Sequence, residues 1–391
     1  MTRVHRLLFV ALLALILPIL AACGATPTAS PGNEYGSAPA DAPADGAAAA
    51  TDGVDRSRLS RELYFYNWSD YIDLDTLKQF EDEYGVRVIY DTYDSNEDMI
   101  AKVRAGNSGY DVVAPSDYAV QIMIAEGLVQ PLDKEMLTNL VHMDPAYLDT
   151  YFDPGNVYSV PYMVGLTGIA YNSEFFPDGV DSWAALFDPA NLEAIRGRLS
   201  MLEDERETPG AVLRFLGHSL NTTDPAILRE VEQILIAQKP FLAAFNSSDV
   251  NRKLASGEYV IAHSWNGTAA QARTGLGGEF SGNPNINFVI PKEGGTIWMD
   301  NLMILQDSPN AYTAKVFMNF LMRPEIAAQN AEYIGYITPN LDAVPLLSQE
   351  ARDLYAEGFA PDDAMLERLE WIERNEETVA FTDLWTVVKG E

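Results

Sequence analysis

The chain has 391 residues, and its 57 acidic side chains outnumber the 26 basic ones to give a formal net charge of −31. This balance argues against a nucleic-acid-binding protein, which needs clustered lysine and arginine to displace counterions. The single cysteine, Cys23, excludes a disulfide framework and a thiolate metal cluster. Most carboxylates of an acidic protein belong to its hydrated surface, but such a charge also attracts cationic partners over long distances.

Residues 1–22 have the pattern of a secretory signal peptide. Arg3 and Arg6 give a positive start, and an apolar run of 14 residues follows at positions 7–20. A membrane-spanning helix takes about 20 apolar residues, so this run fits the shorter apolar region of a signal peptide. It ends in Leu20-Ala21-Ala22-Cys23, which resembles the lipobox of bacterial lipoproteins, where cleavage leaves a cysteine that carries lipid. We expect Cys23 to be lipidated; the alternative is an ordinary small residue beside a cleavage site.

Residues 23–58 are interpreted as the lipidated cysteine and a flexible linker. Positions 24–58 consist mainly of Ala, Pro, Gly, Ser, Thr and Asp, which cannot bury enough apolar surface to offset the entropy of ordering. No later apolar run is long enough to span a membrane. We therefore expect an extracytoplasmic protein that is anchored by lipid alone, in the periplasm or on the outer face of the cytoplasmic membrane. About 330 residues remain, enough for two domains of about 100 to 200 residues each.

The first part of the folded body alternates predicted strands and helices. Short aromatic or β-branched runs predict strands at positions 63–66, 86–90 and 111–114. The spacing of apolar residues, with a capping box at Ser95-Asn96-Glu97-Asp98, predicts helices at positions 74–84, 96–106 and 117–126. Strands that alternate with helices at this interval predict βαβ units and a parallel sheet.

A second region of the same kind runs from about position 168 to position 290. It contains a predicted helix after Pro209 and another opened by Asp224-Pro225, an N-cap followed by proline at the first helical position. Its predicted strands lie at positions 168–171, 199–202, 259–262 and 286–290. Positions 297–305 are apolar again, and the rest of the chain is mostly helical. Doubly wound sheets bind ligands at the carboxyl ends of their strands, so the loops there are the expected site.

Aromatic rings and carboxylates follow several of these strands. The segments are Asn67-Trp68-Ser69-Asp70-Tyr71, Pro115-Ser116-Asp117-Tyr118, Glu203-Asp204-Glu205-Arg206-Glu207, Ser264-Trp265-Asn266-Gly267 and Trp298-Met299-Asp300. A carboxylate neutralises an organic ammonium group, and an aromatic face attracts it by about 0.5 to 2 kcal/mol. A tryptophan at one strand end is more often a core residue, and Asp70 or Asp117 alone is more often a helix cap. The prediction of a cation site therefore rests on the recurrence of the pair in both regions.

These segments resemble the bacterial periplasmic spermidine/putrescine-binding proteins, the substrate-binding family of polyamine ABC importers. The strand at positions 63–66 with the loop that follows it is similar to the opening strand and first ligand loop of that family. The other similar segments are Tyr93-Asp94-Ser95-Asn96-Glu97, Asn221-Thr222-Thr223-Asp224-Pro225, Pro291-Lys292-Glu293-Gly294-Gly295 and Ile334-Gly335-Tyr336-Ile337-Thr338-Pro339-Asn340. The resemblance runs from about Leu63 to the C-terminus, nearly the whole folded body.

The resemblance implies a fold like the type II periplasmic binding proteins, with two α/β lobes, a ligand cleft and hinge strands that cross between the lobes. The expected first lobe comprises residues 59–165 and 300–344, and the second comprises residues 166–299 and 345–391. A ligand would draw the lobes together. The family further implies a monomer without cofactor or metal, which captures spermidine or putrescine and delivers it to the permease of an ABC importer.

Residues from both lobes are implied to line the ligand slot. They are Trp68, Ser69, Asp70, Tyr71, Ser116, Tyr118, Asp204, Glu207, Trp265, Trp298, Asp300 and Tyr336. Ser69 and Asp70 would hold one terminal amine, Asp204 and Glu207 would pair with the other amines, and the aromatic residues would pack on the methylene chain. The choice of ligand stays open, because Asp70 resembles putrescine binders and Trp298 resembles spermidine binders. The sequence also departs from the family at Thr386, where spermidine binders often have glutamine.

Three other classes were compared with this interpretation. An enzyme is disfavoured, because His142, His218 and His263 lie in no metal-binding spacing and no nucleophile elbow or phosphate loop is present. A binder of anions or metals with the same fold would present arginine, lysine, helix N-termini or clustered histidine, which the predicted residues lack. A lipoprotein that senses polyamine and signals to a partner would have the same site, so that alternative stays open.

Overall fold

The computed structural model describes residues 53–374 and 378–390. The predicted signal peptide, Cys23 and the linker up to residue 52 lie outside these residues. None of the helices in the described ranges has both the length and the apolar character that a membrane span requires. Residues 54–58 of the predicted linker contact helix α10 (Ala311–Leu321): the Asp55 amide donates to the Tyr312 hydroxyl at 2.8 Å, and the Arg58 guanidinium lies 3.9 Å from the centre of the Tyr312 ring.

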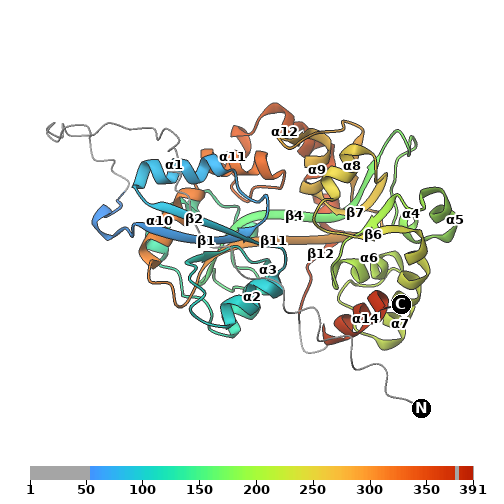
Figure 1. Ribbon diagram of the computed structural model, residues 1–391, viewed down its shortest axis with the longest axis horizontal. Coiled ribbons are helices and arrows are strands. Elements are labelled where there is room, and N and C mark those ends of the chain that lie inside the picture. Colours follow the sequence, from blue (N-terminus) through green and yellow to red (C-terminus); the bar gives the residue numbers. More distant parts are fainter. Residues whose placement is uncertain (1–52, 375–377, 391) are drawn as a thin grey trace, which may run out of the picture. The chain divides into compact units, whose positions relative to one another are not determined.

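A ten-stranded sheet organises the described chain, with the strand order β2-β1-β3-β11-β4-β7-β5-β6. Strand β10 pairs with β4 outside this path, β12 pairs with β11, and β8 and β9 form a separate hairpin. The strands are β1 (Glu62–Trp68), β2 (Arg87–Tyr93), β3 (Val112–Val113), β4 (Ser159–Asn172), β5 (Leu199–Met201), β6 (Leu242–Phe245), β7 (Ile261–Trp265), β8 (Gly275–Leu276), β9 (Phe280–Ser281), β10 (Ile286–Val289), β11 (Gly295–Ile304) and β12 (Leu369–Glu370). The long strands β4 and β11 lie side by side and connect the two ends of the sheet (Figure 1).

The two ends of the sheet are parallel and its middle is antiparallel. Strand β1 runs parallel to β2 and β3, and β5 runs parallel to β6 and β7, which confirms the βαβ pattern expected in both regions. The strand predicted at positions 168–171 is the last part of the longer β4, and both β4 and β10 run against their neighbours. Strand β6 was not predicted, because Leu-Ala-Ala-Phe contains no β-branched residue and directly follows a helical segment.

Most helices begin and end where the sequence patterns predict. Asp73 accepts the Asp75 amide at 3.0 Å at the start of α1, and Gly85 ends α1 with φ 69°. Ser95 accepts the Asp98 amide at 3.1 Å before α2, as the capping box requires. The helix expected after Pro209 begins slightly earlier, at Glu207. The helices are α1 (Leu74–Tyr84), α2 (Asn96–Arg104), α3 (Asp117–Ala125), α4 (Ala184–Phe187), α5 (Pro189–Leu192), α6 (Glu207–Phe215), α7 (Pro225–Gln238), α8 (Val250–Ser256), α9 (Asn266–Thr274), α10 (Ala311–Leu321), α11 (Pro324–Ile334), α12 (Gln349–Leu354), α13 (Asp363–Leu366) and α14 (Val379–Gly390).

Short helical turns connect these elements. The 3₁₀ turns are η1 (Arg56–Arg58), η2 (Lys134–Met136), η3 (Thr138–His142), η4 (Pro145–Tyr147), η5 (Glu193–Ile195), η6 (Lys239–Phe241) and η7 (Val344–Leu346), and η8 (Tyr355–Phe359) is a π-helical turn.

Side chains of alternate strand residues enter different cores, as the pleat of a strand requires. Phe65 of β1 packs at 5.3 Å from Phe317 of α10, in a first core whose buried members come only from residues 63–163 and 302–347. The neighbouring Tyr66 faces a second core, which extends along β4 and β11 to α9 and β10. A third core lies around β5, α6, α7 and α14, and its buried members come only from residues 169–261 and 381–388. The middle strands therefore join two separately packed ends.

Candidate ligand-binding site

A buried carboxyl group, Asp300 of β11, joins two loops from the β1–β3 end of the sheet. Its Oδ1 accepts the Ser116 hydroxyl at 2.6 Å, and its Oδ2 accepts the Tyr71 hydroxyl at 2.5 Å. Ser116 also forms an isolated β-bridge with Asp300. The loop after β1 and the start of α3 thus meet at the middle of a strand that crosses the sheet.

A second buried carboxyl group, Glu207, begins α6 at the other end. Its Oε1 accepts the Thr167 hydroxyl of β4 at 2.8 Å, and its Oε2 accepts the Thr296 hydroxyl of β11 at 2.9 Å. Thr296, Trp298 and Asp300 are alternate residues of β11, so their side chains share one face of the strand. Both carboxyl groups therefore lie along one face of the β4–β11 pair. Thr296, which donates to Glu207, and Asp300 are roughly 13 Å apart along β11.

Burial shifts the protonation of these groups. It raises the pKa of Asp300 to about 7, although the hydrogen bonds from Ser116 and Tyr71 act in the opposite direction. Burial, reinforced by the nearby Asp204 carboxylate, raises the pKa of Glu207 to about 7. Desolvation penalises the charged form of a carboxyl group unless a cation compensates. The site is consequently built to gain from a positively charged ligand.

Aromatic rings surround the two carboxyl groups. The Tyr336 ring lies 5.0 Å from Trp298 and 5.6 Å from Tyr71, measured between ring centres. The Trp298 indole donates to the Thr167 hydroxyl at 3.1 Å and lies directly over Gly165, where an added Cβ would come within 2.0 Å of the ring. Trp265 of β7 pairs with Thr167 in register. The strands thus bring four of the predicted aromatic residues to the same place.

The loop after β1 carries the remaining predicted residues of that end. The Trp68 indole donates to the Ala114 carbonyl at 2.8 Å, and its ring packs 4.6 Å from Tyr93. Ser69 and Asp70 are exposed, and Asp70 has φ 53°, a left-handed conformation that aspartate tolerates better than most residues. Partial burial and then the Glu279 carboxylate raise the pKa of Asp70. Asp70 therefore faces the β8–β9 hairpin from the opposite end of the sheet.

Asp204 and Tyr118 lie at the starts of α6 and α3, at the other side of the site. One oxygen of Asp204 accepts the amides of Arg206 at 2.7 Å and Glu207 at 2.8 Å, so it fixes the start of α6. The Tyr118 hydroxyl donates to Glu97 at 3.2 Å. The guanidinium of Arg374 lies 4.0 Å from the centre of the Tyr118 ring. The sequence patterns did not point to Arg374, because a cation site was expected to consist of carboxylates and aromatic rings.

Asp117 is a third buried carboxyl group near the first two. It is the first residue of α3 and Ser116 is the N-cap, so the helix-cap interpretation of Asp117 is wrong. Its Oδ1 accepts the adjacent Tyr118 amide at 2.6 Å, and its Oδ2 has no hydrogen-bond partner among the described residues. Burial, together with the charges of Asp300 and Glu207, raises the pKa of Asp117 well above its usual value. Its charged form is therefore disfavoured as long as no cation lies nearby.

Other predicted residues lie elsewhere. Thr386 is exposed on α14, where its hydroxyl donates to the Thr382 carbonyl at 2.8 Å. His263 is buried 5.4 Å from the Trp183 ring, and burial lowers the pKa of its imidazole to about 3, so it is neutral. His218 follows the end of α6 and does not lie on it. In the described part of the chain, no group of three or more His, Cys, Asp or Glu side chains is arranged to hold a metal ion.

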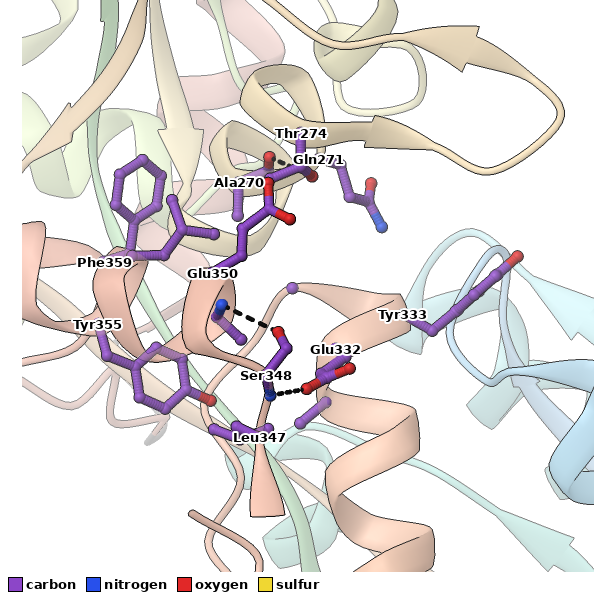
Figure 2. A pocket seen from close by; sticks show the side chains of 14 residues that line it. Ala270, Gln271, Thr274, Glu332, Tyr333, Leu347, Ser348, Glu350, Tyr355 and Phe359 are labelled. Carbon is purple, nitrogen blue, oxygen red and sulfur yellow. Dashed lines mark hydrogen bonds between the residues drawn. The ribbon is translucent and has the colours of Figure 1, made fainter. Parts of the chain in front are cut away.

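A cavity of about 160 Å³ lies apart from these residues, between α9, α11 and the chain around α12 (Figure 2). Tyr333, Tyr355 and Phe359 line it, and none of the predicted ligand residues does. Figure 2 shows the Ser348 amide donating to Glu332 and the Ser348 hydroxyl accepting the Ala351 amide, which caps α12. The Ser348 and Glu332 groups in this cavity are thus engaged in holding the local backbone.

Residues 75–355 match the family of bacterial extracellular solute-binding proteins. The chain belongs to this family. The solute-binding protein is 43% identical to the spermidine/putrescine-binding periplasmic protein of Escherichia coli over 79% of this chain and 86% of that protein. It is 38% identical to the putrescine/cadaverine-binding protein of Pseudomonas aeruginosa over 86% of this chain and 96% of that protein. The predicted relationship to the polyamine-binding proteins is confirmed.

Solved structures agree with this assignment. The spermidine/putrescine ABC transporter substrate-binding protein of Streptococcus pneumoniae is 34% identical, with a TM-score of 0.72 over 85% of this chain and 99% of that one. A lipoprotein of Treponema pallidum is 28% identical, with a TM-score of 0.73 over 84% of this chain and 100% of that one. The predicted α/β fold of the periplasmic binding proteins, with two lobes and crossing strands, is confirmed.

Proposed function

We propose that this solute-binding protein captures a polyamine, spermidine or putrescine, and delivers it to the permease of an ABC importer. The observation that supports it best is the pair of buried carboxyl groups, Asp300 and Glu207, on one face of the β4–β11 pair with aromatic rings around them. Relatives of more than a third identity bind such ligands by name, including the spermidine/putrescine-binding protein of Escherichia coli.

The chemistry of a polyamine matches this arrangement. Its amines resemble the lysine side chain, whose usual pKa is about 10.4, so they are charged at neutral pH. An ammonium group 4 Å from a carboxylate gains about 4 kcal/mol at an effective dielectric constant of 20, before desolvation is subtracted. The rings of Trp298, Tyr336 and Tyr71 supply apolar surface for the methylene chain and cation–π attraction for the amines.

The proposed contacts extend to both ends of the site. We assign one terminal amine to Ser69 and Asp70, and the far amines to Glu207 and Asp204. The other proposed contacts are Trp68, Tyr71, Ser116, Tyr118, Trp265, Trp298, Asp300 and Tyr336.

The packing supports the proposed lobe boundaries. We propose residues 59–165 with 300–344 as the first lobe, and residues 166–299 with 345–391 as the second. The separate first and third cores support this division, since the first draws buried residues only from 63–163 and 302–347. The register of the β4–β11 pair shifts between Asp300 and Asn301, beside the proposed boundary. Closure of the lobes would complete the ring of carboxylates around the ligand.

We further propose that the protein is monomeric and held at the outer face of a membrane by a lipid on Cys23. The family of extracellular solute-binding proteins supports the compartment. Replacing Cys23 by Ser should move the full-length protein from the membrane fraction to the soluble fraction and abolish labelling with a radioactive fatty acid. Retention on the membrane with undiminished labelling would contradict the anchor.

The binding function is tested by calorimetric titration of residues 54–391. Putrescine, cadaverine, spermidine, spermine, lysine and glutamate form the ligand panel. We expect the polyamines to bind and the amino acids not to bind. The variants Asp300→Asn and Glu207→Gln should weaken polyamine binding more than 100-fold, whereas Asp82→Asn, on the exposed Lys78–Asp82 pair of α1, should not. Absence of polyamine binding, or equal binding of glutamate, would overturn the proposal.

A further inference from the structure

The chain from β12 onward forms a segment, residues 369–374, that is held from two sides. Strand β12 pairs with β11 through Leu369 and Glu370. On the α6 side, the Asn221 amide donates to the Trp371 carbonyl at 2.8 Å, and Arg206 donates to the Glu373 carbonyl at 2.7 Å. These contacts fix the position of residues 369–373.

The opposite side of the same segment is held by the first lobe. The Tyr151 hydroxyl donates to the Ile372 carbonyl at 2.9 Å, and the Trp371 ring packs 6.2 Å from Phe152. Glu370 is anchored in addition by Arg214 and by the Ser219 hydroxyl at 2.7 Å. Because the segment is held from both sides, the backbone that carries Arg374 has a fixed position.

Arg374 is surrounded by the groups that a site for an organic cation would supply. Its guanidinium lies over the Tyr118 ring, and its Nη2 lies 2.9 Å from Glu97 Oε1 and 3.6 Å from Glu205 Oε1. Glu97 and Tyr118 come from α2 and α3, and Glu205 comes from the β5–α6 loop next to the predicted ligand residue Asp204. A guanidinium from the chain thus occupies an acidic, aromatic position between elements of both lobes.

This position lies at one end of the proposed polyamine site. Tyr118 is a proposed ligand residue, and the Arg374 cation already covers its ring. Asp204 and Glu205 attract the same guanidinium. The Arg374 Nε is buried without a hydrogen-bond partner, so the guanidinium is not completely satisfied there. A ligand ammonium placed at the same end would meet a like charge at short range.

We propose that Arg374 acts as a built-in cation that takes the place of the outermost ligand amine, and that it thereby selects short diamines over longer polyamines. The inference rests on the proposed polyamine function and names the ligand class within it. A two-amine ligand such as putrescine has only four methylenes between its amines, so it needs only two neighbouring acidic positions and does not have to reach Asp204 or Tyr118. A three-amine ligand such as spermidine reaches toward Asp204 and Tyr118, where Arg374 repels its last amine.

The experiment compares putrescine and spermidine on wild-type protein and on Arg374→Gln by calorimetry. In Arg374→Gln, spermidine affinity should rise at least tenfold relative to putrescine affinity, and putrescine affinity should change less than threefold. Glu97→Gln loosens the guanidinium from the other side and should shift the same ratio in the same direction by a smaller factor. Arg87→Gln is the control, because it removes one positive charge from an exposed pair with Glu62 on the β1–β2 strands.

The outcomes separate the two proposals. If wild type binds neither polyamine, the proposed function fails and this inference fails with it. If wild type binds and both variants keep the wild-type ratio with unchanged melting temperatures, Arg374 does not select the ligand. An equal change in the affinity of both ligands would likewise overturn the inference, because it would make Arg374 a connection between the lobes only. If Arg374→Gln does not fold, the Glu97→Gln ratio decides.

Discussion

The hydroxyl of Tyr71 donates a 2.5 Å hydrogen bond to the carboxyl group of Asp300, 229 residues away in the sequence. Tyr71 belongs to the loop after the first strand, and Asp300 lies in the middle of β11, which crosses the sheet. The bond therefore ties the loop proposed to receive one ligand amine to the strand whose carboxylate is proposed to neutralise another. Both groups are buried, so the bond is shielded from competing water.

Replacing Tyr71 by Phe should weaken this connection. The substitution leaves Asp300 Oδ2 without its donor in a buried position, which costs about 1 to 3 kcal/mol in the free energy of unfolding. It should also raise the pKa of Asp300 further, because the Tyr71 hydrogen bond lowers that pKa. Urea unfolding measures the loss of stability, and its pH dependence measures the shift in the pKa of Asp300. The control is Tyr64→Phe, whose hydroxyl donates to Glu62 near the surface, and an equal loss in the two variants would contradict the expectation.

The ligand-free protein should be less stable at pH 7.5 than at pH 5. Burial raises the pKa of Asp300 from 3.8 to about 7, so between about pH 4 and pH 7 the folded protein keeps a proton that the unfolded chain has lost. The free energy of unfolding then falls as the pH rises, by about 1.4 kcal/mol per pH unit for one group and about 4 kcal/mol over the whole window for Asp300. Glu207, with its pKa raised from 4.5 to about 7, acts in the same direction.

Denaturant unfolding at a series of pH values tests this dependence. Asp300→Asn should reduce the slope between pH 4 and pH 7 to the share that Glu207 contributes, and Asp82→Asn should leave the profile as in wild type. A wild-type protein with constant stability over that range would show that neither carboxyl group is protonated in the folded state.

Polyamine binding should release protons. A bound ammonium group favours the charged form of Asp300 and Glu207, so at pH 7, where each is about half protonated, binding should release on the order of one proton in total. Affinity should accordingly increase from pH 6 to pH 8. Calorimetry in two buffers of different ionisation enthalpy measures the number released. Asp300→Asn should lower it, and release that is zero in wild type would refute the linkage.

Asp117→Asn should have little effect. Because burial raises the pKa of Asp117 and so disfavours its charged form, an amide of the same shape, which is always neutral, should replace it with small cost. We expect a change in polyamine affinity of less than about threefold (about 0.6 kcal/mol) and a melting temperature near that of wild type. A loss as large as that of Asp300→Asn would mean that Asp117 is charged when the ligand is bound.

Gly165→Ala should displace the Trp298 ring. The new Cβ would lie 2.0 Å from a ring carbon, which no small adjustment of the indole can relieve. Overpacking of this kind costs about 1 to 3 kcal/mol in stability, and it should weaken polyamine binding through the loss of the aromatic wall. Gly277→Ala is the control, since its Cβ would meet no atom within 4 Å. Equal affinities in the two variants would remove Trp298 from the site.

Local sequence patterns determine most of the secondary structure of this protein. The capping residues Ser95 and Asp224, the alternation of strands with helices, and the aromatic–carboxylate pairs at strand ends depend on neighbours within a few residues. Such patterns predicted the two parallel ends of the sheet and the strand-end segments that carry the site. The resemblance to the polyamine-binding proteins then singled out Tyr71, Ser116, Glu207, Trp298 and Asp300 within those segments. Local backbone preference and hydrophobic periodicity act at this range, so the sequence is sufficient for them.

Only the tertiary structure decided the features that depend on distant segments. The antiparallel pairing of β4 with β11 places Thr167 and Thr296 around Glu207, and no local pattern in either strand specifies that partner. The burial of Asp117 and the raised pKa values of Asp300 and Glu207 result from packing against segments far along the chain. Arg374 reaches Tyr118 because residues 369–373 are held from both sides. Contacts of high sequence separation carry no short-range signal, since they form only when the whole sheet is assembled.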